Sequence, residues 1–455
     1  MLTGVPRGKE GGISELWRLT YPLMLSTASV AVMQFVNRLF LSRFSPEAIA
    51  AAVPAGTLSF TVISFFVGMT AYTNVFIAQY YGGRRYARLS VALWQGVWLA
   101  VFTAAVIIAT VPLGRWIIST SAHAPEVKIL EVDYYTIVAG FGGLATLNAA
   151  LSSFFTGQGK TKITMWVNVA GNVINVIFSY LLVFGFGGVA PMGIRGAAYA
   201  LVIGSAAMAG IYSFFIFSQH NRRVFRTGRL FGFYWPQFKQ LLKYGVPNGA
   251  SFFMEIASFT VFIFLVGNTD KYILAANNIG LTIDMLAFLP IVGVGMAAQT
   301  LVGQYIGRKK KEIAFKVVRS ALALVLPYTI ALSLIFLFAP QLLLGLFVRG
   351  TAEMDLVAAH AYPLMKVLSV FIFFDALNVV YSDAIKGAGD TRFQLLMASV
   401  WAWLLFVPGV YVILSVLRLS FIYTWVWGCF YAALLALTFF LRFKSGVWQR
   451  INITA

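Results

Sequence analysis

Residues 90–114 read SVALWQGVWLAVFTAAVIIATVPLG, an apolar stretch without a single charged side chain. About 20 such residues are enough for a helix to cross the hydrocarbon core of a bilayer. The chain contains twelve mostly apolar stretches of this length, and several exceed the minimum, so we expect tilted or protruding helices. Their approximate limits are 18–41, 47–78, 90–114, 132–156, 163–184, 194–219, 240–267, 273–304, 315–347, 356–385, 393–416 and 419–441. The sequence therefore predicts an all-α integral membrane protein with twelve transmembrane helices.

The overall composition agrees with this prediction. Of the 455 residues, 60% are apolar and 11% are charged, whereas about a quarter of the residues in a soluble domain are charged. This excludes a disordered chain and argues against an ordinary soluble enzyme. A lone cysteine, Cys429, excludes disulfides and cysteine-based metal sites, and three widely separated histidines exclude a local histidine metal motif.

The positive charges lie in short clusters between the apolar stretches. The formal net charge is +19, and 25 of the 34 Lys and Arg residues fall in one set of alternating loops, against 7 in the other set. In membrane proteins the Lys- and Arg-rich loops face the cytoplasm. We therefore expect a multi-pass protein of the cell inner (plasma) membrane with both termini in the cytoplasm, and no nucleic-acid partner.

Three motifs of the first half recur in the second half in the same order. Pro22 corresponds to Pro247, and the segment 78–82 (AQYYG) corresponds to 303–307 (GQYIG), both at an offset of 225 residues. The segment 157–162 (GQGKTK) recurs as 387–392 (GAGDTR), at an offset of 230. Such ordered matches indicate an internal repeat rather than a shared apolar composition.

Each repeat contains six spans, so both copies enter the membrane from the same side. Parallel repeats of this kind place a substrate site near the midplane between them. We expect an N-terminal lobe over residues 1–220, a cytoplasmic linker over 221–239 and a C-terminal lobe over 240–455. The triplet Gly159-Lys160-Thr161 lacks the glycine of a phosphate loop five residues upstream, where Phe154 stands, so no nucleotide site is expected.

Acidic residues inside the predicted spans are the main candidates for function. Glu255, Asp284 and Asp375 lie within spans of the second half, and the first half has no acid at comparable depth. Burying a carboxylate in a bilayer is costly, which makes each of them a functional candidate. Glu255 and Asp284 lie at similar depth, whereas Asp383 lies near the cytoplasmic end of its helix, where Lys386 is a possible partner.

Side chains near these acids suit two kinds of ligand. Hydroxyl and amide groups such as Asn378 favour a small hard cation, whereas the rings of Phe252, Phe259 and Phe371 favour an amphipathic organic cation. With 41 Phe in the chain, helix packing is the alternative explanation for any single ring. We expect Glu255, Asp375 and Asp284 to bind the coupling cation. If that ion is Na⁺, Glu255 and Asp375 would be its metal ligands. The residues expected to line the substrate cleft are Asn37, Phe252, Phe259, Phe371 and Asn378.

The chain resembles the multidrug and toxic compound extrusion (MATE) transporters, and within them the NorM-like bacterial branch. The resemblance covers nearly the whole chain and rests on the order and spacing of several short motifs. These are Pro22, Phe35-Val36-Asn37, residues 78–82, 157–161, Asn172, 192–198, 245–247, 253–255, Leu289-Pro290, 302–304, Asp375-Ala376 and 387–391.

The resemblance implies two six-helix lobes around a V-shaped cleft, and antiport in which Na⁺ or H⁺ entry drives export of amphipathic, mostly cationic compounds. It also implies that Glu255 and Asp375 contribute to the cation site. Many bacterial members carry an aspartate where this chain has Asn37, which casts doubt on an ion site in the first lobe and leaves Asn37 as a residue of the substrate cleft. No cofactor beyond the coupling ion is expected, and the protein is expected to act as a monomer.

Three other functions fit the sequence less well. A lipid-linked oligosaccharide flippase of the same superfamily would need a more cationic cavity, for which only Lys366 and Arg38 are available within the spans. A membrane-embedded enzyme would need a His, Asp or Ser constellation at one interface, and we find none. An ion channel is disfavoured by the lobe-sized repeat and by the lack of a recognisable filter sequence.

Overall fold

The protein is helical throughout the part of the chain that the structure describes. This computed structural model describes residues 10–188, 190–267, 270–345, 347, 352–451 and 453. Within these ranges there are helices and no β-strand. Twelve helical segments are long and apolar enough to cross a membrane, which confirms the predicted all-α transmembrane class.

The described helices fall into two compact units that do not follow chain order. Unit 1 comprises the described residues up to Met24 together with Met254–Ile453, and unit 2 comprises Leu25–Phe253. Two helices, α1 (Ile13–Phe44) and α10 (Trp235–Gly267), each pass from one unit into the other. Each contains a proline near that point, Pro22 in α1 and Pro247 in α10. The unit boundaries therefore lie inside these helices and not in segment 221–239, and the predicted division by chain order stays a prediction.

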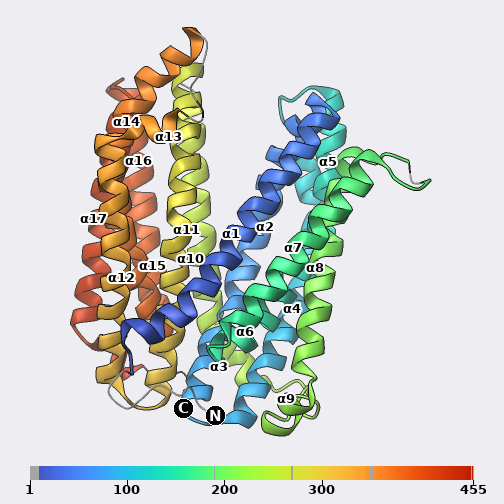
Figure 1. The fold of residues 1–455 in the computed structure, drawn as a ribbon, viewed down its shortest axis with the longest axis vertical. Coiled ribbons are helices and arrows are strands. Elements are labelled where there is room, and N and C mark those ends of the chain that lie inside the picture. Colours follow the sequence, from blue (N-terminus) through green and yellow to red (C-terminus); the bar gives the residue numbers. More distant parts are fainter. Residues whose placement is uncertain are drawn as a thin grey trace. The chain divides into compact units, whose positions relative to one another are not determined.

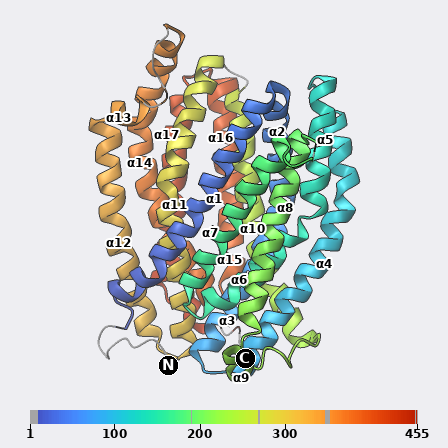
Figure 2. The ribbon, with the colours of Figure 1, turned by 45° about the vertical axis from the view of Figure 1, so that its right-hand side comes forward.

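Unit 2 contains eight complete helices besides its parts of α1 and α10. They are α2 (Pro46–Ala71), α3 (Thr73–Gly82), α4 (Tyr86–Ser119), α5 (Pro125–Gly140), α6 (Gly143–Gly157), α7 (Thr161–Phe184), α8 (Gly193–Ile216) and the short α9 (Gln219–Val224). Only Tyr72 separates α2 from α3, so these two helices form one span. Helices α5 and α6 also form one span. The strongest packing joins α7 to α8, α2 to α5 and α4 to α6 (Figure 2).

Unit 1 is built around the long helix α14 (Ala352–Ala388). It packs against α11 (Lys271–Gly307), α12 (Lys311–Phe338) and α17 (Ile422–Lys444), as Figure 1 shows. Another span runs from Thr391 to Val416 and includes two π-helical segments. The remaining elements are α13 (Pro340–Leu344), α15 (Thr391–Val400), η1 (Trp401–Phe406), α16 (Val407–Tyr411), η2 (Val412–Val416) and the 3₁₀ turn η3 (Val447–Arg450).

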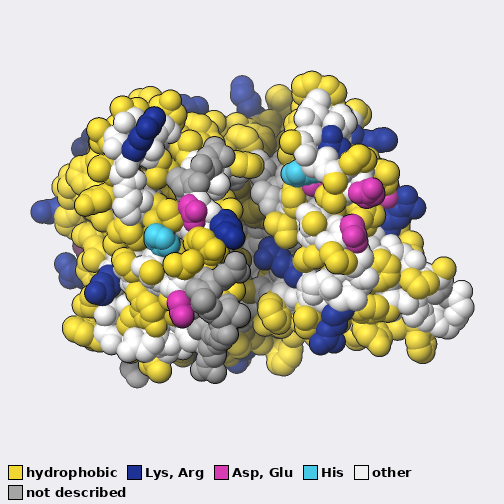
Figure 3. Space-filling model, turned by 90° about the horizontal axis from the view of Figure 1, so that it is seen from above, with side chains coloured by type: hydrophobic (Ala, Val, Ile, Leu, Met, Phe, Trp, Pro, Cys, Tyr) yellow, Lys and Arg dark blue, Asp and Glu magenta, His cyan; other side chains and the backbone are white. Residues whose placement is uncertain are grey.

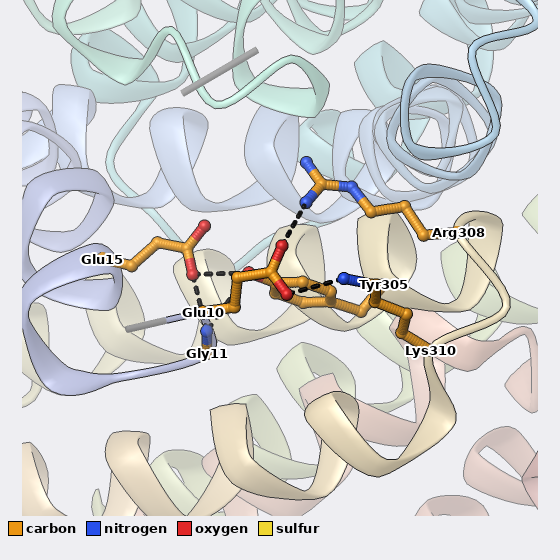
Figure 4. Close-up of polar contacts among 6 residues, drawn as sticks. All are labelled: Glu10, Gly11, Glu15, Tyr305, Arg308 and Lys310. Carbon is orange, nitrogen blue, oxygen red and sulfur yellow. Dashed lines mark hydrogen bonds and ion pairs between the residues drawn. The ribbon is translucent and has the colours of Figure 1, made fainter. Parts of the chain in front are cut away.

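A buried carboxylate fixes the start of α1 to the turn between α11 and α12 within unit 1. Glu15 Oε2 accepts hydrogen bonds from the Gly11 N–H at 2.7 Å and from the Tyr305 hydroxyl at 2.6 Å, and Glu15 is only 4% exposed. Glu10 pairs with Lys310 at 2.7 Å on the same turn. Tyr305 belongs to the repeated motif 303–307, which therefore has a structural role. Figure 4 shows the contacts among Glu10, Gly11, Glu15, Tyr305, Arg308 and Lys310.

Candidate carboxylate site

Three helices of unit 1 carry the predicted acids. Glu255 lies on α10, Asp284 on α11 and Asp375 on α14. The carboxylate of Asp375 is close enough to interact electrostatically with both Glu255 and Asp284. Glu255 and Asp284, which are distant from Asp375 along the chain, thus both lie within electrostatic range of it. Because like charges repel, such a group is stabilised by a cation among its members.

The surroundings of Asp375 include the predicted amide. Asn378, one turn further along α14, donates from Nδ2 to Asp375 Oδ1 at 3.3 Å. Both side chains are partly accessible, and the Glu255 side chain is exposed. The Ser258 hydroxyl donates to the Glu255 carbonyl at 2.9 Å, so its proton is already used on the backbone. The amide of Asn378 therefore contacts one carboxylate, and the acids on α10 and α14 are not fully buried.

An aromatic cluster lies next to these acids. Phe262 of α10 contacts Trp425 of α17 edge-on, with ring centroids 5.3 Å apart, and Trp425 contacts the predicted Phe371 at 5.6 Å. Tyr431 stacks on Phe406 at 4.8 Å and lies within electrostatic range of Glu255 and Asp375. Rings beside carboxylates suit an organic cation, although each of these rings also packs against another ring.

The two other predicted aromatic residues lie in different surroundings. Phe259 is 37% exposed and contacts Phe262 at 5.7 Å. Phe252 belongs to unit 2, where it meets Phe60 of α2 edge-on at 6.3 Å. Phe259 therefore borders the aromatic cluster, whereas Phe252 contributes to packing within unit 2.

A lysine lies at one side of the acidic group. Lys386 Nζ is 3.2 Å from Asp383 Oδ1, the pairing considered from the sequence, and both residues lie within electrostatic range of Glu255. A side chain at Gly295 of α11 would collide with the Asp383 carboxylate, so the glycine makes room for it. Within the described residues, no group of three or more His, Cys, Asp or Glu side chains is arranged to hold a metal ion.

The corresponding region of unit 2 is polar but carries no acid. Asn37 is buried, and its Nδ2 donates to Asn175 Oδ1 on α7 at 2.9 Å. Two further bridges join α1 to α7, from Asn172 to Ser29 at 2.8 Å and from Asn168 to Ser26 at 2.6 Å. Asn37 thus faces α7, and neutral side chains take the place of an ionisable group along this helix pair.

Sequence reasoning did not identify Tyr431, which lies within electrostatic range of the acids, or Trp425, which contacts Phe371. Trp425 Nε1 donates to Asn277 Oδ1 of α11 at 2.9 Å, and Asn277 is fully buried. Both rings lie on α17, far from Glu255 in the chain, in a sequence with 11 Trp and 20 Tyr. The sequence offered one hint of such a partner: Asn277 lies inside the predicted span 273–304, and an amide buried there needs a hydrogen-bond partner.

The chain has twelve membrane-length helices in two related halves, and the second half carries acids within its spans. These features are typical of a multi-pass membrane transporter. The family model of MatE matches residues 22–181 and 247–412, two segments whose starts are 225 residues apart, as in the internal repeat. The chain therefore belongs to the MatE family, and it resembles the NorM-named members.

Individual relatives cover nearly the whole chain. A probable multidrug resistance protein NorM of Thermotoga maritima is 26% identical over 96% of this chain and 93% of its own length. The multidrug resistance protein PmpM of Pseudomonas aeruginosa is 25% identical over 87% of this chain and 83% of its own. A solved structure of a MOP superfamily transporter from Pyrococcus furiosus shares the fold, with a TM-score of 0.86, 18% identity and coverage of 96% and 97%.

Proposed function

We propose that this protein is a cation-coupled antiporter that exports amphipathic, mostly cationic organic compounds. The observation that supports this most is the group of three intramembrane acids, Glu255, Asp284 and Asp375, on three different helices. Na⁺ or H⁺ binds there, and its entry drives alternating access. The names of the NorM and PmpM relatives, which refer to multidrug resistance, support the class of substrate.

The energy available to such a site is sufficient for export. One charge moving inward down a potential of 100 mV releases about 2.3 kcal/mol, equivalent to roughly a fifty-fold concentration gradient. A ligand shifts the balance between inward- and outward-open states only through its different affinities for them. In this proposal the coupling ion and the organic cation compete, directly or through conformation, for states stabilised by Glu255 and Asp375, because both neutralise the same negative charge.

The flippase alternative is not favoured by the residues at the site. A lipid-linked oligosaccharide carries phosphate, which carboxylates repel. Arg38 and Lys366, the two cations considered for a phosphate-binding cavity, are both exposed. Lys386, which lies within electrostatic range of Glu255, is paired with Asp383.

Purified protein in liposomes tests the proposed function. Export of a fluorescent amphipathic cation is followed first with an imposed sodium gradient at constant pH, and then with a pH gradient without sodium. We expect at least one gradient to drive export, and the comparison identifies the ion. If neither gradient moves the dye, while a lipid-linked oligosaccharide crosses the same membranes, the antiporter assignment is wrong.

A further inference from the structure

One end of unit 2 carries many cations and no carboxylate. The turns 82–86 and 157–161 and the segment from 216 to 235 lie at this end, named the basic end. Its cations are Arg84, Arg85, Arg88, Lys160, Lys162, Arg222, Arg223, Arg226, Arg229, Lys239 and Lys243, and all but Lys160 are exposed. Residues 48–125 and 134–254 contain no Asp or Glu at all. The positive charge of the basic end therefore cannot be neutralised by carboxylates within unit 2.

The acids of unit 2 lie at its opposite end. Glu47 is in the first turn of α2, and Glu126, Glu131 and Asp133 lie within the first nine residues of α5. Acidic side chains on this face are visible in magenta in Figure 3, which is seen from above. In unit 1, by contrast, cations near the equivalent turns have acidic partners, such as Lys310 with Glu10 and Arg442 with Asp390 at 2.7 Å each. Arg222, Arg223, Arg226 and Arg229, by contrast, lie in a stretch of unit 2, residues 134–254, that contains no Asp or Glu.

Arg222 and Arg223 lie on the short helix α9, and the turns that follow, which carry Arg226 and Arg229, are held along α4. Ser90 Oγ donates to the Phe225 carbonyl at 2.5 Å, Trp94 Nε1 to the Thr227 carbonyl at 3.0 Å, and Trp98 Nε1 to the Phe231 carbonyl at 3.0 Å. Successive anchors are four residues apart on α4, so the segment follows the helix axis. From Ser90 to Trp98 it climbs about 12 Å, at about 1.5 Å per residue.

This path separates cations from aromatic rings by depth. Arg222, Arg223, Arg226 and Arg229 precede or accompany the lower anchors, whereas exposed rings follow at and above Trp98. Phe233 contacts Trp98 and Phe102 of α4 with centroids 6.3 and 6.1 Å apart. Four rings of the segment are between 45% and 57% exposed: Phe231, Phe233, Tyr234 and Trp235.

The cations lie at the end of unit 2, and the exposed aromatic rings lie about two helical turns nearer its middle. This order matches a membrane interface, where the phosphate layer lies outside the boundary between headgroups and acyl chains. Aromatic side chains favour the level where headgroups meet acyl chains, and Lys and Arg attract anionic lipid phosphates. We infer that segment 222–235, together with Arg84, Arg85 and Arg88, is a binding site for an anionic phospholipid. The arginines bind the phosphate, and Phe233 and Trp235 lie against the acyl chains.

The test is titration of the purified full-length protein in neutral detergent with phosphatidylglycerol or phosphatidylcholine, with bound lipid counted by native mass spectrometry. The wild type should prefer phosphatidylglycerol by about tenfold or more, since each cation near an anionic surface contributes strongly. Replacing Arg222, Arg223, Arg226 and Arg229 with Gln should remove that preference. Equal binding of both lipids by the wild type would overturn the proposal.

A matched variant of unit 1 controls for net charge. It replaces four exposed cations with Gln: Lys309 in the turn between α11 and α12, Arg319 on α12, Arg392 on α15 and Arg450 on η3. It loses the same four charges, so its affinity for phosphatidylglycerol should stay within about twofold of the wild type. Equal losses in the two quadruple variants would show a non-specific charge effect and contradict the proposal.

Two further measurements do not depend on the folding of the arginine variant. Raising NaCl from 0.1 to 1 M shortens the screening length from about 10 to 3 Å, so wild-type binding of phosphatidylglycerol should weaken several-fold. The double variant F233S/W235S keeps every charge and should weaken both lipids several-fold. Salt-independent binding, or full displacement of the lipid by an equal concentration of glycerol phosphate, would contradict a lipid site.

Discussion

Lys160 and Asp390 occupy equivalent positions in the two repeats but carry opposite charges, and their surroundings explain the difference. Asp390 is buried and accepts a hydrogen bond from Arg442 Nε at 2.7 Å at the end of α17. Helix α8, which ends the first repeat, has no cation over residues 196–216. Lys160 instead lies 5.5 Å from the Phe225 ring centroid. An acid at position 160 would lack the partner that Asp390 has.

Lys160 allows a test of how the folding stability of the protein depends on pH. Burial lowers the pKa of Lys160 below its usual 10.5, because desolvation penalises the charged amine. A lowered folded-state pKa means that the charged lysine opposes folding, and that this cost disappears as pH rises from the folded pKa towards 10.5. Lys160→Met should therefore be at least as stable as the wild type at pH 8, with an advantage that shrinks near pH 10.

Thermal unfolding in detergent at the two pH values measures this effect. Lys162→Met, a change at the exposed neighbouring lysine, is the control and should show no such pH-dependent difference. A Lys160→Met protein that is clearly less stable than the wild type at pH 8, by an amount independent of pH, would show that the contact with Phe225 outweighs desolvation.

At the scale of elements, close helix packing in unit 2 depends on glycine. Gly249 of α10 lies against Gly68 of α2. A Cβ atom added to Gly68 would lie only 3.0 Å from the Cα atom of Gly249. A side chain on Gly249 would collide with the Phe65 carbonyl, which is backbone and cannot move aside. Small residues allow membrane helices to approach closely in this way.

We expect Gly249→Ala to destabilise the protein by about 1–3 kcal/mol, the usual cost of overpacking. Gly210→Ala on α8 is the matched control, because nothing lies within 4 Å of the added carbon. That change should be neutral or stabilising by up to about 1 kcal/mol, since alanine favours a helix. Unfolding temperatures measured side by side decide the matter, and equal effects of the two changes would rule out the packing argument.

The spans themselves were predictable, whereas their interruptions were not. Apolar length alone located all twelve spans, and most limits differ from the structure by a few residues because helices extend beyond the apolar core. The break at Tyr72 and the π-helical segments at Trp401–Phe406 and Val412–Val416 left no signal in the apolar pattern. Such irregularities depend on packing between helices, which composition does not encode.

The same reasoning applies to the candidate site. Glu255, Asp284 and Asp375 were recognisable individually, because an acid in an apolar span is conspicuous. Their meeting point, and the presence of Trp425 and Tyr431 beside it, depend on the packing of α10, α11, α14 and α17. Sequence spacing gives the depth of a residue along its helix but not the direction in which the helix faces.

For the molecule as a whole, contacts divide the chain differently from its repeats. The first part of α1 packs with unit 1, and the first part of α10 packs with unit 2. Repeat boundaries follow chain order, whereas packing boundaries fall near Pro22 and Pro247, prolines that occupy equivalent places in the two repeats. Each unit therefore contains a helix segment from the other repeat, which the sequence repeat alone did not indicate.

The proposal that acids within the spans of unit 1 power export is tested by neutralising them one at a time. Ion-driven export of a fluorescent organic cation is measured in liposomes for E255Q, D375N and the control D355N, an exposed acid near the start of α14. Unfolding temperatures close to that of the wild type establish that each variant is folded. We expect export by E255Q and D375N to fall to the level of protein-free liposomes, and D355N to export at the wild-type rate. Wild-type export by folded E255Q and D375N would contradict the assignment of the coupling site.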